Sequence, residues 1–392
     1  DDVNLTKFYQ ELKLADGKLE ADYRYYPYMV TMYDCSMISC IQEIKEVGKD
    51  NSTPFEDLES ITNEQIAMYA DLNYVFNNIA NYNSPIKVSN LNEKNEELHR
   101  YKVMVGSSKK EKLKIAIANV KLDPANFEKI VEDNPNRSYR RYRDLSTIVN
   151  QAIDQDADML VMPESFMPYE WLSTLARTCA RNKLAVVTGI EHIKYNGYIF
   201  NLTATILPYK EGKHNCAFIT FHLKTHYAPK EQQQIIGYGL KEVRGSNYEL
   251  YVWNDCHFPV YCCYELSSIK DRSLFMSCAD MLVAVEWNKD INYYSNILES
   301  LSRDIHCYCV QVNSSNYGDS RITKPSKTEV KDIIRTKGGS NSTVLVDEID
   351  IKTLRDFQIK GYNLQQHDNR FKPTPPNFDK KLVMEKIKGT LK

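Results

Sequence analysis

The sequence predicts an α/β protein built from layers of sheet and helix. Short apolar runs typical of buried strands recur from residue 113 onward. Between them lie amphipathic segments whose apolar residues are spaced three and four apart, as in helices packed on a core. Strands that alternate with helices in this way are characteristic of layered α/β domains.

Residues 1–110 differ from the rest of the chain. Tyrosines crowd within residues 23–33, and helical periodicity follows over residues 37–44 and 63–80. A polar stretch then leads to one short strand expected at 101–105. We therefore divide the chain into a helical, Tyr-rich N-terminal extension and linker (1–110), which one interpretation makes the tail of a preceding domain, and a main domain (111–392).

The main domain contains the alternating elements. The predicted strands cover residues 114–120, 159–162, 185–190, 198–207, 216–223, 258–262, 281–285, 307–312 and 342–346. The predicted helices cover residues 139–157, 171–182, a segment after Cys263, and 295–305. The fourth and fifth strands flank the turn-rich residues 209–213 and form a hairpin.

Composition excludes few functions. Hydrophobic residues make up 42% and charged residues 26% of the chain, which are ordinary values for a globular protein. The net charge of −2 gives no electrostatic signal for nucleic acid or membrane binding. No apolar run reaches the roughly 18 residues of a membrane span. The chain begins without an initiator Met or a signal-peptide pattern, which suggests an internal start within a longer polypeptide.

The ten cysteines show no disulfide-framework spacing, so a reducing cytoplasm is the simpler interpretation of the compartment. The best candidate metal cluster is Cys307-Tyr308-Cys309 beside His306. Paired CxxC units are absent, and the spacing fits a strand in a core better than a zinc site. We therefore predict no metal.

Three predicted strands end at a chemically capable residue. Glu164 follows residues 159–162, Lys224 follows the strand ending at Leu223, and Cys263 follows residues 258–262. Strand ends are where sites assemble in layered α/β folds. A carboxylate, an ammonium and a thiol together can carry out acyl transfer by base catalysis, nucleophilic attack and oxyanion stabilisation.

Each of these residues also has a plainer interpretation. Most cysteines are small buried hydrophobes, but one at a strand-to-helix junction meets a helix N-terminus, which favours thiolate. Adjacent Cys262 is interpreted as strand core. His222 and His226 are expected to be structural or supporting residues, because spacing places no third metal ligand.

Three ordered motifs resemble the nitrilase superfamily of carbon–nitrogen hydrolases. The strand running into Pro-Glu is matched by residues 160–166, the Lys motif by residues 224–231, and the Cys-Tyr-Asp motif by Cys263-Tyr264-Glu265. Residues 187–190 and 200–203, Val285-Glu286-Trp287 and residues 344–350 supply further matches in order. The likeness covers roughly residues 113–360.

The resemblance implies a four-layer α-β-β-α sandwich that pairs into dimers or larger homo-oligomers. It also implies a site that needs no cofactor. In that site Cys263 is the nucleophile, Glu164 the general base and acid, Lys224 the stabiliser of the tetrahedral intermediate, and Glu231 the group that orients amine or water. The remaining expected oxyanion and pocket residues are Tyr264, through its backbone N–H, Trp287 and Glu265.

Two segments depart from the family pattern. Residues 266–270 replace the usual Arg-Phe-Pro-Glu, so the resemblance does not transfer a substrate. Residues 124–143 are long and basic through Arg137, Arg140, Arg141 and Arg143. This segment could cover the site or form a docking surface. A basic face exposed to solvent is the more usual outcome for such a run of charges.

Two functions follow as hypotheses. The first is thiol-dependent hydrolysis of a non-peptide C–N bond in a small amide or carbamoyl compound, with nitrile hydrolysis as the narrower case. The second is a catalytically reduced module that serves oligomerisation or regulation in a larger protein. The overall pattern also resembles the nitrilase-like part of bacterial reverse transcriptase–nitrilase fusions in antiviral defence. That resemblance implies a neighbouring reverse transcriptase domain, although this chain contains no polymerase motif.

Overall fold

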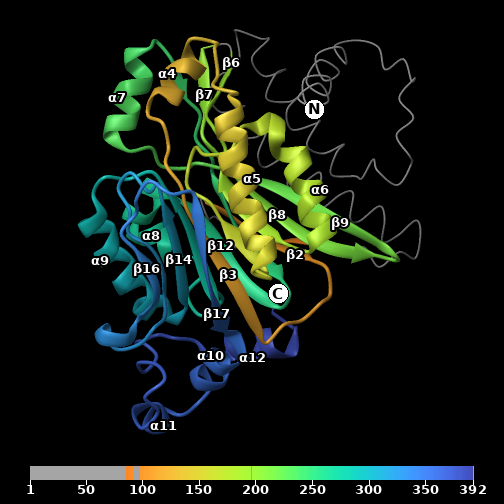
Figure 1. The fold of residues 1–392 in the computed structure, drawn as a ribbon. Coiled ribbons are helices and arrows are strands. Elements are labelled where there is room, and N and C mark those ends of the chain that lie inside the picture. Colours follow the sequence, from red (N-terminus) through yellow and green to blue (C-terminus); the bar gives the residue numbers. More distant parts are fainter. Residues whose placement is uncertain (1–84, 92–97, 196, 392) are drawn as a thin grey trace.

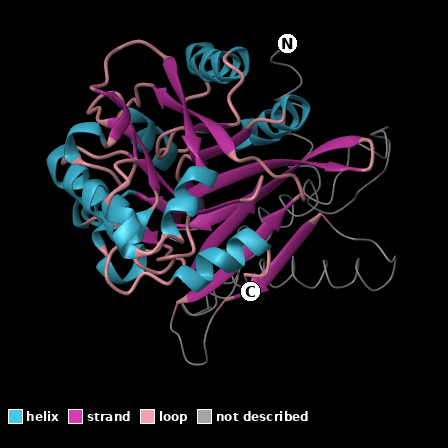
Figure 2. Cartoon of the chain, turned by 90° about the horizontal axis from the view of Figure 1, so that it is seen from below, coloured by secondary structure: helices cyan, strands magenta, loops and turns pink. Residues whose placement is uncertain are grey.

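Two sheets face each other across an apolar core, and helices cover the outer face of each sheet (Figure 1). The computed structural model describes residues 85–91, 98–195 and 197–391. Seen from below, the strands cross the middle of the molecule with helices outside them (Figure 2). The predicted layered α/β architecture is therefore confirmed.

The first sheet has six strands and contains the strand that leads to Glu164. In spatial order its strands are β17 (Thr343–Asp350), β3 (Lys112–Asn119), β4 (Met159–Val161), β5 (Ala185–Gly189), β8 (Leu202–Glu211) and β9 (His214–Leu223). The strands β3, β4 and β5 are parallel, so they deliver their carboxyl ends to one edge. The hairpin β8–β9 confirms the predicted one.

The second sheet has eight strands and contains the strand that leads to Cys263. In spatial order its strands are β1 (Ile86–Asn90), β2 (His99–Val105), β11 (Asn247–Trp253), β12 (Cys256–Cys262), β13 (Met281–Glu286), β14 (Tyr308–Asn313), β15 (Ser320–Thr323) and β16 (Asp332–Thr336). A small third sheet orders β10 (Lys241–Glu242), β7 (Tyr198–Phe200) and β6 (Ile193–Tyr195).

The helices form the two outer layers and the C-terminal end of the described chain. They are α4 (Ala125–Val131), α5 (Tyr139–Asp154), η1 (Tyr169–Trp171), α6 (Leu172–Asn182), α7 (Pro229–Gly237), η2 (Cys263–Ser267), α8 (Ile269–Arg272), α9 (Ile291–Leu301), η3 (Ser302–His306), η4 (Thr328–Val330), α10 (Ile351–Gln358), α11 (Tyr362–Gln366) and α12 (Lys380–Lys388). Three predicted helices are confirmed as α5, α6 and α9 with η3. The one expected after Cys263 is only a 3₁₀ turn, η2, followed by the single turn α8.

Side-chain alternation along the central strands separates two apolar cores. On β13, Met281, Val283 and Val285 face the other sheet, while Leu282 and Ala284 face the helices α8 and α9. Both faces are apolar because both are covered, as is usual for parallel strands. This is why such strands appear in the sequence as continuous apolar runs.

Strand pairing reaches into the segment expected to be extension and linker. The predicted short strand at 101–105 is confirmed within β2, which pairs with β1 and, in parallel, with β11. The second sheet therefore begins at residue 86. The predicted helices at 37–44 and 63–80 lie outside the described residues.

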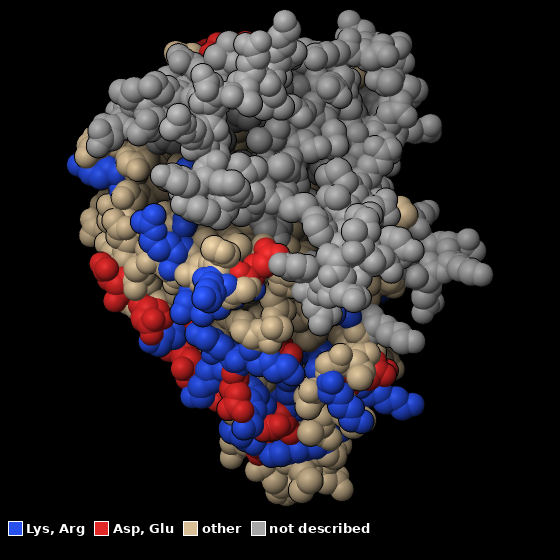
Figure 3. Space-filling view, turned by 90° about the vertical axis from the view of Figure 1, so that its right-hand side faces the viewer, with Lys and Arg blue, Asp and Glu red and all other residues tan. Residues whose placement is uncertain are grey.

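The surface mixes charges of both signs. On the coloured part of the face in Figure 3, Lys and Arg lie directly beside Asp and Glu, in keeping with the net charge of −2. No helix in the described ranges combines the length and apolar character needed to cross a bilayer.

A buried ion network fastens the C-terminal helices to the second sheet. Asp280 is fully buried and accepts hydrogen bonds from Arg355 of α10 (2.6 and 2.9 Å), Lys386 of α12 (2.8 Å) and the backbone N–H of His257 (2.9 Å). Burial alone raises the pKa of Asp280, but the two cations hold it well below its ordinary value. The carboxylate is therefore charged and fully paired.

We predict that Asp280→Ala lowers the free energy of unfolding by about 3–5 kcal/mol, because it removes the ion-pair partner of buried Lys386 and leaves Arg355 with Asp255 alone. Urea denaturation of both proteins measures the difference. Glu111→Ala, which removes the exposed pair with Lys352, is the control and should change stability little. Equal effects for the two variants would contradict this account of the network.

Candidate active site

The centre of the candidate site is the buried ammonium of Lys224, immediately after β9. Its Nζ donates to Glu164 Oε1 (2.8 Å) and to Glu231 Oε2 (2.7 Å). Its backbone N–H donates to the carbonyl of Asn201 (3.0 Å), which fixes the point where the chain leaves the strand. One of its three ammonium N–H donors has no hydrogen-bond partner among the described residues.

The carboxylate of Glu164 is held on both oxygens. Oε1 accepts from Lys224 and from Asn201 Nδ2 (2.8 Å), and Oε2 accepts from the backbone N–H of Trp287 (3.1 Å). Trp287 follows β13, so this contact ties the base to the second sheet. Glu164 thus bridges the two sheets of the sandwich.

Glu231 lies in the first turn of α7 and completes the arrangement. Its Oε1 accepts from Asn201 Nδ2 (2.9 Å) and lies 3.4 Å from His192 Nε2, and its Oε2 also accepts from the backbone N–H of Ala228 (3.3 Å). Asn201 and Lys224 therefore both donate to both carboxylates. The sequence-predicted site residues did not include His192, and Asn201 appeared only within the matching segment 200–203.

The charges at the centre stabilise one another. Burial alone lowers the pKa of Lys224, but Glu164 and Glu231 outweigh it and raise the pKa well above its ordinary value. Burial alone raises the pKa of Glu231, but Lys224 and then His192 bring it below its ordinary value. At neutral pH the centre therefore holds the ammonium of Lys224 and the carboxylate of Glu231.

Cys263 lies at the corner where β12 ends and η2 begins. Its φ of 47° is in the left-handed region, which an L-residue adopts only where the fold requires it. Tyr264 follows in the first turn of η2, where backbone N–H groups have no partner inside the helix. The strand therefore ends at Cys262 and the turn begins at Cys263, as predicted, and the oxyanion role of the Tyr264 N–H stays a prediction.

The thiol of Cys263 is not stored as thiolate. Burial and the charge of Glu164 raise its pKa well above the ordinary value, and Lys224 offsets only part of this. Burial and Glu164 thus oppose the preference for thiolate that we expect from a helix N-terminus. Cys263 is 7% exposed, and it must lose its proton to a base before it can attack.

Cys262 also reaches the carboxylate. Its Sγ donates to Glu164 Oε1 (3.4 Å) and lies 4.0 Å from Asn201 Oδ1, whereas the described contacts include no hydrogen bond from Cys263 to Glu164. The side chain is buried in strand core as interpreted from the sequence, but it also contacts the candidate base. Two thiols therefore share one acid–base group.

Glu265 holds the site together from behind. It is fully buried and accepts from the backbone N–H groups of Thr225 (2.6 Å) and Cys262 (2.7 Å), and from His222 Nε2 (2.9 Å). Its carboxylate thus joins the residue after Lys224 to the residue before Cys263. Glu265 was expected among the oxyanion and pocket residues, but in the structure it links these two segments and does not line the hollow beside the centre.

The two histidines on either side of Lys224 are bound to carboxylates, in line with a structural role. His222 lies between Glu249 and Glu265, and His226 Nε2 lies 2.5 Å from Asp271 Oδ2. Neither belongs to a group of three or more His, Cys, Asp and Glu side chains arranged for a metal in the described ranges. His306 instead contacts the carbonyl of Lys372 (2.7 Å), and Cys307 and Cys309 lie in the core on the helix side.

A small hollow of about 10 Å³ lies beside the centre. Its polar wall includes Ser165 and His192, whose Oγ and Nδ1 are 3.3 Å apart, and its apolar wall includes Phe127, Ile130 and Trp287. The indole N–H of Trp287 is buried without a hydrogen-bond partner. Sequence analysis expected Trp287 here but missed Ser165, which has a φ of 54° directly after Glu164.

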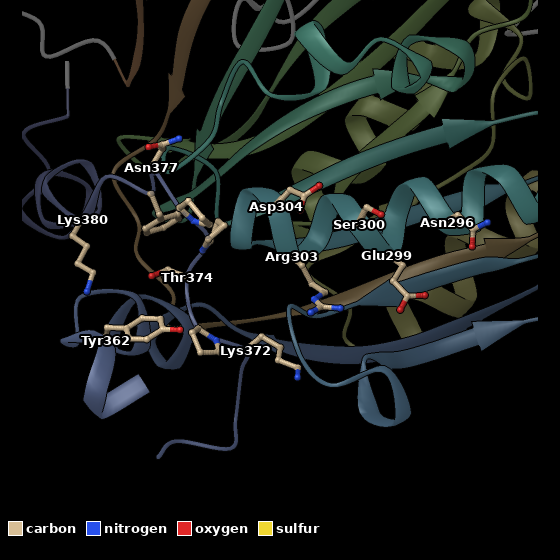
Figure 4. Close-up of a pocket in the computed structure, with 14 residues that line it drawn as sticks. Asn296, Glu299, Ser300, Arg303, Asp304, Tyr362, Lys372, Thr374, Asn377 and Lys380 are labelled. Atoms are coloured by element: carbon tan, nitrogen blue, oxygen red, sulfur yellow. The ribbon is translucent and has the colours of Figure 1, made fainter. Parts of the chain in front are cut away.

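A much wider open hollow, of about 1020 Å³, lies along α9, η3 and the segment 372–380 (Figure 4). Figure 4 shows Glu299, Arg303 and Lys372 grouped on one side and Tyr362 and Lys380 on the other. Its lining contains neither a cysteine nor any member of the Glu164–Lys224–Glu231 centre. Its lining includes the carboxylates of Glu299 and Asp304 but no thiol.

The basic stretch 124–143 is only partly a solvated face. Arg140 and Arg143 are exposed, but Arg137 donates to Glu191 (2.7 Å) and Glu170 (2.9 Å), and Arg141 donates to Glu191 and to the carbonyl of Phe166 (2.7 Å). The solvated interpretation is wrong for these two arginines. They fasten the start of α5 to the loop that follows Glu164 and to the residue before His192.

Comparisons with known proteins were made on sequence and on structure. No protein-family model and no curated protein sequence matches the chain. Among solved structures, one similar chain is a CN-hydrolase superfamily protein from Xanthomonas campestris with an arsenic adduct in its active site. It shares 12% identity at a TM-score of 0.46, over 67% of this chain and 99% of that one.

A second similar structure is an amidase from Nesterenkonia sp., with 14% identity and a TM-score of 0.45 over 67% of this chain and 98% of that one. A double mutant of that amidase in complex with acrylamide matches at 12% identity and a TM-score of 0.44, over 67% and 98%. Those structures belong to nitrilase-superfamily proteins. At these scores the function of the present chain is argued from its own site.

Gly189 provides a test of how Glu164 is held. A Cβ at this position would lie 2.3 Å from Glu164 Cα and 2.4 Å from the backbone N of Ser165. We predict that Gly189→Ala displaces Glu164 and lowers the free energy of unfolding by about 1–3 kcal/mol, as overpacking does. Chemical denaturation checks this against Gly361→Ala, where nothing lies within 4 Å and stability should hold.

His222 predicts a pH dependence of stability. Burial alone lowers its pKa, but Glu265 and Glu249 raise it to about 10. The folded state therefore keeps a proton that the unfolded state loses near pH 6.5. This contribution is complete below about pH 6.5 and declines up to pH 10, by at most about 1.4 kcal/mol per pH unit.

We expect denaturation between pH 6.5 and 10 to show a shallower decline in His222→Gln than in the unsubstituted protein. His214→Gln, at an exposed position in the β8–β9 turn, is the control and should keep the original slope. An unchanged slope in His222→Gln would show that His222 is not charged in the folded protein.

Proposed function

We propose that the protein hydrolyses a non-peptide C–N bond of a small amide or carbamoyl compound through a thioester on Cys263. The observation that carries the proposal is the buried ammonium of Lys224 bonded to both Glu164 and Glu231 beside a thiol at a strand end. This supplies a base, an oxyanion donor and a nucleophile from three separate elements. None of these steps requires a metal or organic cofactor.

The first half of the reaction forms the thioester. Glu164 takes the proton of Cys263, and the thiolate attacks the carbonyl carbon of the substrate. The free N–H of Lys224 and the backbone N–H of Tyr264 stabilise the oxygen of the tetrahedral intermediate. As the intermediate collapses, Glu164 returns its proton to the nitrogen of the leaving amine, which breaks the C–N bond.

The second half releases the acid. A water molecule enters where the amine left, Glu164 takes its proton, and the hydroxide attacks the thioester. Glu231 orients the amine and then the water, because its carboxylate is fixed by Lys224 and Asn201. Collapse of this second intermediate returns the proton to Cys263 and restores the thiol.

The assignment of Cys263 rather than Cys262 as nucleophile rests on position. Cys263 is the more exposed of the two, at 7% against 1%, and it adjoins the N–H groups of η2. Cys262 is the last residue of β12, and its thiol already points at Glu164. The hollow beside the centre, of about 10 Å³, has room for about one water molecule.

The alternative of a catalytically reduced module has one observation in its favour. Neither Cys263 nor Lys224 belongs to the lining of that hollow, which instead reaches Trp287 and His192, the contacts of Glu164 and Glu231. On this alternative the fold would serve assembly or regulation in a longer protein. The predicted homo-oligomer, the cytoplasmic location and the neighbouring reverse transcriptase domain in antiviral defence stay predictions.

The test is acyl transfer to the thiol. On incubation with a panel of small amides and carbamoyl compounds, mass spectrometry should find an acyl adduct on Cys263. The adduct should be absent in Cys263→Ala and should form roughly 100- to 1000-fold more slowly in Lys224→Met, as on loss of an oxyanion donor. Cys179→Ala and Lys230→Met, at a buried apolar cysteine and an exposed lysine, are the matched controls.

The outcomes separate the hypotheses. An adduct on Cys262 that persists in Cys263→Ala would show that Cys262, and not Cys263, is the nucleophile. No adduct with any compound, together with an unchanged oligomeric state in all four variants, would favour the non-catalytic module.

A further inference from the structure

Cys262 is a buried nucleophile that the proposed reaction does not use. Along β12, Phe258, Val260 and Cys262 face the space between the sheets, and Tyr261 faces the helices. Simple alternation would send the next side chain to the helix side. The left-handed backbone at Cys263 ends the extended chain, and this side chain also lies in the core between the sheets.

The corner therefore brings two adjacent thiols to one side of the sheet, next to the same charges. Glu164 and Lys224 both shift the pKa of each thiol. The Sγ of Cys262 donates to Glu164 Oε1, so this thiol has a base within reach (3.4 Å). A buried cysteine in an ordinary strand has only apolar neighbours and no such partner.

We propose that Cys262 and Cys263 form a reversible oxidation site, in which Cys262 captures the sulfenic acid of Cys263 as a vicinal disulfide. The oxidant is hydrogen peroxide or a small organic peroxide. Cys263 meets it first because it is the more exposed thiol, at 7% against 1%. Glu164 serves as the base in both steps.

The chemistry balances without any other reactant. Cys263 loses its proton to Glu164, and its sulfur attacks the O–O bond of hydrogen peroxide, giving the sulfenic acid and one water. Cys262 then loses its proton to Glu164, and its thiolate attacks the sulfur of Cys263 and displaces hydroxide. The hydroxide takes the proton back from Glu164 and leaves as the second water. Two thiols and one peroxide thus become one disulfide and two waters.

The bond formed in this way is strained. Adjacent Cα atoms are about 3.8 Å apart across a trans peptide. Ordinary disulfides span about 4.4–6.8 Å between Cα atoms, and departures store strain that makes the bond easier to reduce. Strained disulfides have higher reduction potentials and belong to the labile, regulatory kind. Oxidation would therefore block the thiol temporarily and spare it from irreversible sulfinic acid.

The chain contains a second close pair of cysteines that serves as an internal control. Cys307 and Cys309 lie next to each other in the apolar core on the helix side, where both are fully buried. No carboxylate is among the groups that shift the pKa of Cys309. If proximity of two thiols were sufficient, both pairs would be oxidised. If solvent access and a nearby base are also needed, only Cys262 and Cys263 would be oxidised.

The experiment treats the reduced full-length chain with hydrogen peroxide, blocks the remaining thiols with N-ethylmaleimide and maps the peptides by mass spectrometry. We expect the peptide with Cys262 and Cys263 to lose two hydrogens and to recover them with dithiothreitol. The peptide with Cys307 and Cys309 should stay reduced under the same dose. In Cys307→Ser, oxidation at the first pair should be unchanged.

The substitutions of Cys262 decide the mechanism. In Cys262→Ser and in Cys262→Val, which retains a strand-forming apolar side chain, Cys263 should progress to sulfinic acid, and no two-hydrogen loss should occur. The proposal is overturned if the two-hydrogen loss persists in these variants, which would indicate a sulfenamide with backbone nitrogen. It is also overturned if the peptide stays reduced in the unsubstituted chain. The measurement does not depend on amide hydrolysis. The oxidation proposal can therefore be confirmed or rejected independently of the proposed function.

Discussion

One buried ammonium determines how this site is built. An unpaired lysine in an apolar interior would shed its proton, because desolvation penalises the charge. Lys224 keeps its charge only because Glu164 and Glu231 each contact it at hydrogen-bond distance. The three groups therefore require one another. Removing either carboxylate would leave a buried charge poorly compensated, and this explains why the structure holds both with so many further donors.

The charges around Lys224 also act on the thiol of Cys263. Glu164 raises the pKa of this thiol, and Lys224 offsets only part of the rise. The raised pKa of the Cys263 thiol follows from this and from burial. A resting thiol that ionises only as its proton passes to Glu164 is suited to attack on a bound substrate. It also limits unproductive alkylation in the free protein.

Sequence reasoning located the centre because its three members occupy strand ends. Apolar runs can be found without a structure, and the residues that follow these runs, Glu164, Lys224 and Cys263, are of types that can carry out acyl transfer. Sites assemble at strand ends in layered α/β folds, so their meeting was a physical expectation, although the three strands come from two sheets. The layers of the fold were predictable for the same reason, since both faces of the central strands are apolar.

What sequence could not supply was pairing between distant segments. β2 pairs in parallel with β11 across more than a hundred residues of intervening chain, so a polar stretch that resembles a linker becomes sheet. Arg141 appeared solvated because its counter-charge, Glu191, lies far along the chain. Asn201 and His192 carry no local signal, because each acquires its role only when Glu231 of α7 arrives beside it.

The left-handed corner at Cys263 shows how a local irregularity creates chemistry. An extended backbone there would separate the two thiols onto opposite faces, one toward Glu164 and one toward α9. The turn that places Cys263 at the start of η2 also returns it to the side where Cys262 already contacts Glu164. The position of Cys263 at the corner and the proximity of a second thiol are thus consequences of the same backbone angle. Valine at position 262 would keep Cys263 at the corner but would remove the neighbouring thiol. The choice of cysteine there is therefore the feature that amide hydrolysis alone does not explain.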